Sequence, residues 1–311
     1  MRCSPLPRLP LVLLAAGCAF LAACSTAASG AAGSAGSGRG PVIQVVAAEN
    51  FWGSIASQIG GRHVHVTSII TNPDTDPHSY EPTAADARTI AGAQFVIENG
   101  IGYDPWAARL LESDKTSATV LNVGTLLGVP DGGNPHRWYN PADVHAVVRQ
   151  ITADLSKLDP AARSYFASRQ TRFDTVALAR YHALIAAIKA RYSGTPVGAS
   201  ESIFAMLAPA LGLKLITPYS FLKAISEGTD VTAADKLTID NQISHHLIKV
   251  YVYNSQNVTP DVQAQLAEVK ADHIPTATIT ETLVPASATY QAWQVRELHG
   301  ILAALAKATS H

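Results

Sequence analysis

The feature that most constrains the fold is a long helical pattern in the middle of the chain. Asp159 and Pro160 are typical of an N-cap and a first helical position, and Gly194 and Pro196 end the pattern. Between them, apolar residues recur at helical spacing: Phe166, Phe173, Ala177, Tyr181, Leu184 and Ile188. This predicts one helix from Asp159 to Tyr192, roughly 50 Å long at 1.5 Å per residue. Such a helix is either part of one domain or a rigid connection between two.

The segments on both sides of this helix alternate short apolar strands with helical patterns. Strands are predicted at 42–48, 64–70, 95–98 and 119–123 before the helix, and at 196–199, 214–217, 248–253 and 276–279 after it. Before the long helix, helices are predicted at 52–59, 83–91 and 104–111, and a fourth begins at Pro141 behind an Asn140 cap. After it, helices are predicted at 203–211, 233–245, 260–270 and 290–308. Alternation of this kind is typical of parallel sheets.

We therefore expect an α/β fold with two lobes, each with a parallel four-stranded sheet flanked by helices, joined by one long rigid helix. The N-terminal lobe is predicted at 41–158, the connecting helix at 159–193 and the C-terminal lobe at 194–311. A chain of 311 residues with a net charge of -1 has no basic surface that would indicate binding to nucleic acid.

The N-terminal residues have the pattern of a bacterial signal peptide. Arg2 and Arg8 precede an apolar stretch at 11–21, and Leu-Ala-Ala-Cys at 21–24 resembles a lipobox, in which Cys24 would be lipidated. Residues 25–40 are almost wholly Ser, Ala, Gly and Thr, which predicts a flexible tether. We expect a lipoprotein anchored to the outer face of the bacterial cell membrane. A signal peptide cut without lipidation is the alternative.

The other cysteines, Cys3 and Cys18, also lie near the N-terminus, so the folded body has no disulfide and no thiolate metal site. Candidate metal ligands come instead from polar loops after predicted strands. His78 lies in the loop 71–82 and His136 in the loop 134–141, while Glu201 and Glu281 follow two strands of the second half.

Ligands of open parallel sheets bind beyond the carboxyl ends of the strands, where these four side chains are expected. Each alone has a simpler explanation, because a loop histidine is often a turn residue and a glutamate at a helix start favours the helix dipole. Together, two imidazoles and two carboxylates are a suitable ligand set for one divalent transition metal.

Two histidine motifs, Asp76–Pro82 and Asn134–Trp138, together with the long helix, resemble the zinc/manganese substrate-binding proteins of bacterial ABC importers, the cluster A-I family. The resemblance covers residues 41–309. It implies that Zn²⁺ or Mn²⁺ is a transported ligand held between two lobes by one residue from each of four loops: His78, His136, Glu201 and Glu281. It also implies a membrane permease as partner, a monomer, and no enzymatic step.

The chain departs from many zinc-specific members of that family in one respect. Their His-rich acidic loop is missing, since only 127–133 precedes the second histidine motif. The missing loop and the carboxylates of Glu201 and Glu281 favour manganese slightly, because carboxylate oxygens suit Mn²⁺. A zinc-dependent hydrolase and a surface adhesin are the alternative functions.

Overall fold

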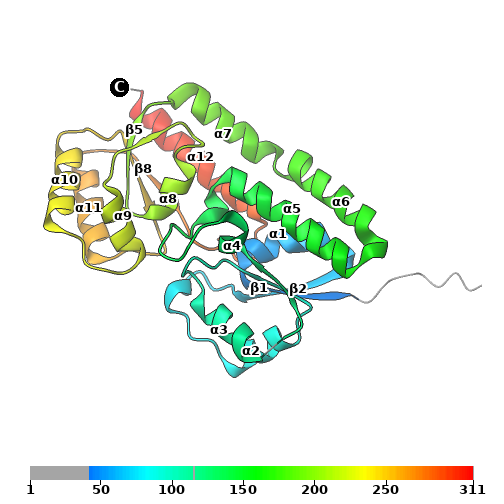
Figure 1. Ribbon diagram of the computed structural model, residues 1–311. Helices are drawn as coiled ribbons and strands as arrows, with labels where there is room; N and C mark the ends of the chain where they lie inside the picture. Colours follow the sequence, from blue (N-terminus) through cyan, green and yellow to red (C-terminus); the bar gives the residue numbers. More distant parts are fainter. Residues whose placement is uncertain (1–41, 115, 311) are drawn as a thin grey trace, which may run out of the picture. The chain divides into compact units, whose positions relative to one another are not determined.

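The first sheet has four parallel strands in the order β2-β1-β3-β4 (Figure 1). The computed structural model describes residues 42–114 and 116–310. The strands are β1 (Ile43–Glu49), β2 (Val64–Ile70), β3 (Phe95–Glu98) and β4 (Thr119–Asn122). The helices of this lobe are α1 (Asn50–Gly60), α2 (Ala84–Ala91), α3 (Pro105–Asp114), α4 (Val123–Leu127) and α5 (Pro141–Leu158).

The second sheet repeats this topology, with four parallel strands in the order β6-β5-β7-β8. Its strands are β5 (Pro196–Ala199), β6 (Lys214–Leu215), β7 (Val250–Asn254) and β8 (Thr276–Ile279). Its helices are α8 (Ser202–Leu207), α9 (Tyr219–Ser226), α10 (Ala233–Ser244), α11 (Pro260–Ala271) and α12 (Tyr290–Ala308). The predicted fold class of two parallel four-stranded sheets flanked by helices is confirmed.

The predicted N-terminal features, namely the signal peptide, Cys24 and the tether at 25–40, lie outside the described residues. Within 42–114 and 116–310, no helix combines the length and apolar character needed to cross a bilayer. The division into two lobes and a connecting helix, with boundaries at 158 and 193, stays a prediction. Helix α12 of the second half packs against α1 of the first half as well as against α7 and β8.

The connecting helix was predicted as a single α-helix, and this is wrong in its middle. It begins with a short 3-10 turn (Pro160–Ala162), continues as α6 (Arg163–Arg172), passes through a π-helical segment (Phe173–Ala177) and ends as α7 (Ala179–Tyr192). Figure 1 shows α6 and α7 as separate stretches.

Apolar positions run through the π-helical segment: Phe173 begins it, and Tyr181, eight residues on, is buried as well. Positions seven and eight apart share one face of a regular α-helix, so this spacing predicts a helix but not its type. The helical stretch therefore lies between the two sheets in the chain, with a local change of helix type in its middle.

Other departures from the predicted elements also have local causes. The helix predicted at 203–211 ends at Leu207, two residues before Pro209, whose ring removes a backbone donor. Strand β6 is shorter than predicted because the Thr217 hydroxyl, instead of a backbone carbonyl, accepts the N–H of Ala199 at 3.0 Å. Helix α9 was not predicted.

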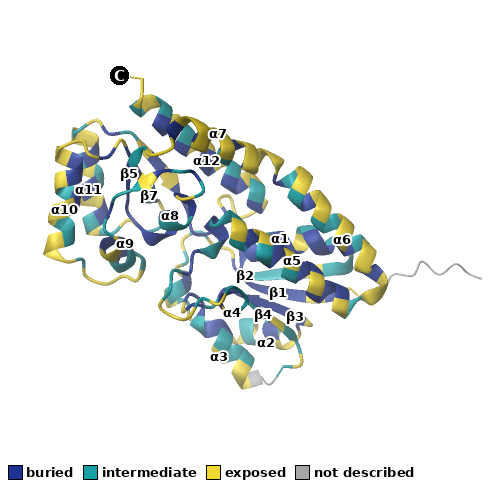
Figure 2. Ribbon diagram, turned by 45° about the horizontal axis from the view of Figure 1, so that its top comes forward, coloured by how far each residue is buried: buried dark blue, intermediate teal, exposed yellow. Residues whose placement is uncertain are grey.

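The two central strands of the first sheet, β1 and β3, are almost wholly buried, as their dark colour in Figure 2 shows. Along β1, Val45 and Ala47 join the main core, whereas Val46 and Ala48 join a second cluster under α2 and α3. This follows from the two-residue period of a strand. The main core continues without a break into the second lobe, so burial of apolar surface holds the two sheets together.

A buried hydrogen-bond network also joins the lobes. The Tyr139 hydroxyl lies 2.6 Å from the Thr280 carbonyl oxygen and 2.5 Å from a carboxyl oxygen of Glu297 on α12. The backbone N–H and the hydroxyl of Thr280 both donate to the other oxygen of Glu297 at 2.9 Å. One hydroxyl proton cannot serve two acceptors, so both Tyr139 contacts are satisfied only when Glu297 carries a proton.

Burial raises the pKa of Glu297 to about 8, although the bonds from Tyr139 and Thr280 lower it. A raised pKa means that the folded protein binds a proton that the unfolded chain has released, so stability falls as pH rises from about 4.5 to about 8. Glu297→Gln, whose amide can donate to Tyr139, should remove this part of the pH dependence, up to about 1.4 kcal/mol per pH unit.

The measurement is the free energy of unfolding in denaturant between pH 5 and 8 for both proteins. Glu112→Gln, which changes an exposed carboxylate on α3, is the control and should follow the wild-type curve. Equal slopes for wild type and Glu297→Gln would show that Glu297 is ionised in the folded protein throughout this range.

Candidate metal centre

His78 lies in a short 3-10 turn (Pro77–Ser79) in the loop between β2 and α2. Asp76 builds this turn: one carboxylate oxygen accepts the backbone N–H of His78 at 2.9 Å, and the other accepts the Ser79 hydroxyl at 3.0 Å. Pro77 fixes the backbone at the first position of the turn. The imidazole is thus held at the carboxyl end of the first sheet, and its Nε2 is buried without a hydrogen-bond partner among the described residues.

His136 is completely buried in the loop before a second 3-10 turn (Arg137–Tyr139). The side-chain amide oxygen of Asn134 accepts the His136 backbone N–H at 3.1 Å and lies 2.9 Å from Nδ1 of the ring. Because an amide oxygen only accepts, Nδ1 carries the proton and Nε2 keeps its lone pair. Within the described chain this Nε2 is also buried and unpaired, which is the form that binds a metal.

Glu281 comes from the second lobe, directly after β8. Its backbone N–H donates to the Gln256 side-chain oxygen at 2.7 Å. One carboxylate oxygen accepts the Tyr103 hydroxyl from the first lobe at 2.9 Å, and the other accepts the Asn254 amide at 2.9 Å. The carboxylate is therefore aimed across the lobe boundary.

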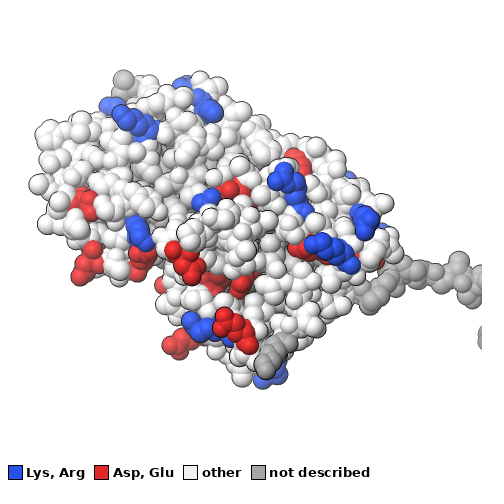
Figure 3. Space-filling model, in the orientation of Figure 1, with Lys and Arg blue, Asp and Glu red and all other residues white. Residues whose placement is uncertain are grey.

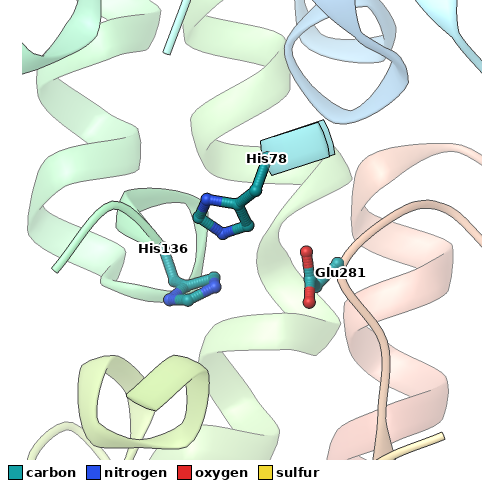
Figure 4. A group of neighbouring side chains, drawn as sticks. All are labelled: His78, His136 and Glu281. Atoms are coloured by element: carbon teal, nitrogen blue, oxygen red, sulfur yellow. The ribbon is translucent and has the colours of Figure 1, made fainter. Parts of the chain in front are cut away.

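These three side chains converge on one point. One ligand atom each of His78, His136 and Glu281 lies within 4.8 Å of the others, and Figure 4 shows both rings and the carboxylate around a common space. Two neutral imidazole nitrogens and one carboxylate oxygen are common ligands of zinc and suit other divalent transition metals. Two unpaired buried nitrogens are costly unless a ligand occupies the space between them.

Glu201 lies nearby but outside this group of three. It is buried at the N-cap of α8, and its side chain makes no capping bond there. One of its oxygens accepts the Asn254 amide at 2.8 Å, and the other accepts the Asn257 amide. Asn254 thus links Glu201 to Glu281, while the role of Glu201 as a ligand stays a prediction.

Residues 45–304 match the family described as ZnuA, the periplasmic component A of a zinc-uptake complex. The chain belongs to the ZnuA family. The resemblance to metal-binding components of importers that the histidine motifs indicated is thereby confirmed.

Curated relatives of this ZnuA-family chain include a manganese-binding lipoprotein MntA from Halalkalibacterium halodurans, 28% identical over 51% of this chain and 51% of the relative. Another is the iron-binding protein YfeA from Yersinia pestis, 30% identical over 55% of this chain and 57% of the relative. The chain thus spans about half the length of the curated relatives it matches.

A solved structure with the same fold is the Mn-bound periplasmic metal binding protein from Candidatus Liberibacter asiaticus. It has a TM-score of 0.70 and 19% identity, and the match covers 85% of this chain and 99% of the other. A crystal structure of ZnuA gives a TM-score of 0.67 at 18% identity and covers 83% of this chain and 99% of the other.

Burial sets the charges of the ZnuA-family site. Burial lowers the pKa of His136 well below its usual value, and the neighbouring His78 lowers it further. Burial also lowers the pKa of His78, against the opposing effects of Asp76 and Glu227. Both imidazoles are therefore neutral near pH 7, as metal ligands must be.

Burial shifts the pKa values of the two carboxylates in the opposite direction, upward. Burial raises the pKa of Glu281 to about 7, with Asp76 raising it and the Tyr103 hydroxyl lowering it. Burial and the charge of Glu281 raise the pKa of Glu201 well above its usual value. Removing two carboxylates from water is unfavourable without a compensating cation, and a divalent ion would supply that charge.

A cleft of about 430 Å³ leads from solvent to the site. The loop at 73–79 lines one side and Ser226–Gly228, Gln256 and Asn257 line the other, with Asp74, Asp76 and Glu227 adding negative charge. Figure 3 shows acidic side chains gathered along the boundary between the lobes. This charge attracts cations toward the open side of the site.

Sequence reasoning missed the residues that support the ligands, namely Tyr103, Asn134, Asn254, Gln256 and Asn257. Asn134 lies two residues before His136 in the same motif, and Asn254 ends β7, so the strand-end argument that found Glu201 applies to it as well. Nothing local to Tyr103 indicates its bond to Glu281, because the partners are 178 positions apart.

The bond from His136 to Asn134 leads to a prediction. Asn134→Ala removes the acceptor that holds the proton on Nδ1, so divalent metal affinity should fall by about 10- to 100-fold, the usual loss for such a supporting residue. Calorimetric titration of metal-stripped protein measures the change. Asn241→Ala, an exposed position on α10, is the control, and an unchanged affinity in Asn134→Ala would show that the tautomer is set by another group.

Proposed function

We propose that this ZnuA-family protein is the extracytoplasmic metal-binding component of an ABC importer. It captures Zn²⁺ or Mn²⁺ between its two lobes and delivers the ion to a membrane permease, without a chemical step and as a monomer. The family description supports a role in metal uptake, and the relatives named above include proteins that bind manganese and iron.

One observation carries this proposal. One ring nitrogen each of His78 and His136 and a carboxylate oxygen of Glu281 lie within 4.8 Å of one another at the boundary of the two lobes. Nε2 of each histidine is buried without a partner in the described chain. Buried polar groups in folded proteins usually have a hydrogen-bond partner, and the described chain supplies none to either nitrogen. Ligands from both lobes around one point are the arrangement that captures an ion between them.

The ligand set is compatible with both ions. Two imidazoles and Glu281 satisfy Zn²⁺, which favours four ligands. Glu201 next to Glu281 adds oxygen and negative charge, which suits the harder Mn²⁺ and a higher coordination number. Zinc binds more tightly than manganese at almost any such site, so relative affinity alone does not identify the cargo. We propose manganese as the physiological cargo.

The proposal predicts that His78→Ala, His136→Ala and Glu281→Ala each weaken both metals at least about tenfold, or roughly 1.4 kcal/mol. Glu201→His should shift the relative affinity toward Zn²⁺, since an imidazole replaces a harder carboxylate. The readout is calorimetry with Mn²⁺ and Zn²⁺ on metal-stripped protein, together with elemental analysis of the protein as isolated.

His245→Ala changes an exposed histidine that follows α10 and is the matched control for loss of an imidazole. It should bind both metals like the wild type. If the His78 and His136 variants also bind like the wild type, the cargo is held elsewhere and the proposed site is wrong.

We also propose that Cys24 carries lipid and anchors the protein to the outer face of the cell membrane, which the lipobox-like sequence at 21–24 supports. Cys24→Ala should move the protein from the membrane fraction to the soluble fraction. Fractionation followed by immunodetection measures this, with Cys18→Ala as the control. A Cys24→Ala protein that stays with the membrane would mean that another segment anchors it.

A further inference from the structure

Asn254 is a fully buried asparagine at the end of β7, and both polar atoms of its side chain have hydrogen-bond partners. Its backbone N–H donates to the Ser200 hydroxyl at 3.1 Å, and its side-chain oxygen accepts the Gln256 backbone N–H at 2.9 Å. The Gln256 bond fixes the orientation of the amide, because only the oxygen can accept it. The two N–H groups of the amide therefore face the metal centre.

Those two N–H groups go to two different carboxylates. The amide nitrogen lies 2.8 Å from Glu201 and 2.9 Å from Glu281. Sheet topology makes this possible, because β7 lies between β5, which precedes Glu201, and β8, which precedes Glu281. All three strands are parallel, so their polar residues meet at one edge of the sheet.

The Asn254 amide is uncharged, and this matters for cation binding. Two buried carboxylates repel each other, and the raised pKa of Glu201 has the charge of Glu281 among its causes. Lysine or arginine between them would relieve the repulsion but would also cancel the charge that attracts a metal. An amide donates one hydrogen bond to each carboxylate and leaves both charges, as well as further lone pairs, available.

We propose that Asn254 is a positioning residue that holds Glu201 and Glu281 as an adjacent carboxylate pair facing the two histidines. The pair supplies the oxygen ligands and the negative charge that favour a hard divalent cation such as Mn²⁺. This inference rests on the proposed function, since it concerns the ion selectivity of the same site.

The test compares Asn254→Ala with the wild type for Mn²⁺ and Zn²⁺ affinity on metal-stripped protein. Without the amide, Glu201 moves away from Glu281, whereas His78, His136 and Glu281 still offer three ligands to zinc. The dissociation constant for Mn²⁺ should rise by about tenfold or more, and that for Zn²⁺ by no more than about threefold. A merely structural role would weaken both ions equally.

A double-mutant cycle asks whether Asn254 acts through Glu201. In a Glu201→Gln background, Asn254→Ala should cause little further loss of Mn²⁺ affinity, because the carboxylate that it positions is already gone. Asn122→Ala is the matched control: Asn122 also ends a strand and donates to a glutamate, Glu98, at 2.8 Å, but it lies in the other sheet. It should leave the ratio of the two affinities unchanged.

Asn254→Ser is a second variant in case the alanine protein does not fold, as judged by circular dichroism. Its single hydroxyl can donate to only one carboxylate, so the same preferential loss of Mn²⁺ is expected. The inference would be overturned if the Asn254 variants lost Mn²⁺ and Zn²⁺ affinity equally or kept both affinities unchanged. Additive effects of Asn254→Ala and Glu201→Gln on Mn²⁺ affinity would overturn it as well. Failure of the wild-type protein to bind either ion would instead overturn the proposed function.

Discussion

The structure depends on burying acidic groups without burying basic ones. Glu49, Glu98, Asp104, Glu201 and Glu281 are all buried, and no lysine or arginine is among the buried residues of the described chain. Neutral donors stabilise some of these carboxylates instead: backbone N–H groups hold Asp104, and amides and a tyrosine hydroxyl hold Glu201 and Glu281. Neutral donors add no positive charge beside Glu201 and Glu281, so no basic side chain competes with a cation there.

The sequence was sufficient for the sheets and for the closeness of three of the four candidate ligands, because both depend on local patterns. Apolar runs bounded by turn residues located β2, β3, β5 and β8 at the observed bounds. Parallel strands bring their carboxyl ends to one edge, so His78, His136 and Glu281 could be placed near one another before any contact was known. Even the polar motif around His136 contained its supporting residue, Asn134.

What could not be predicted depends on contacts between distant segments or on small changes in geometry. The bonds from Tyr103 to Glu281 and from the Leu283 N–H to Asn50 cross the lobe boundary, and no periodic pattern encodes them. Asn50 begins α1, and its side-chain oxygen accepts a bond from the other lobe. The π-helical segment could not be predicted, because the apolar stripe in this stretch still has helical spacing.

The hydrogen bonds across the boundary bear on how an ion would enter under the proposed function. Several of them tie the His136 loop to the second lobe, among them the bonds from Asn134 to the Ser202 carbonyl at 2.7 Å and from Tyr139 to the Thr280 carbonyl at 2.6 Å. His136 and Glu281 are therefore fixed relative to each other across the lobe boundary.

The loop of His78 is held mainly by bonds within itself, from Asp76, and it forms one wall of the cleft that opens to solvent. A loop stabilised by local bonds opens at a lower free-energy cost than a packed lobe boundary does. Under the proposed function, movement of this one loop over a preformed pair of ligands would be enough to admit an ion, so the two lobes need not separate.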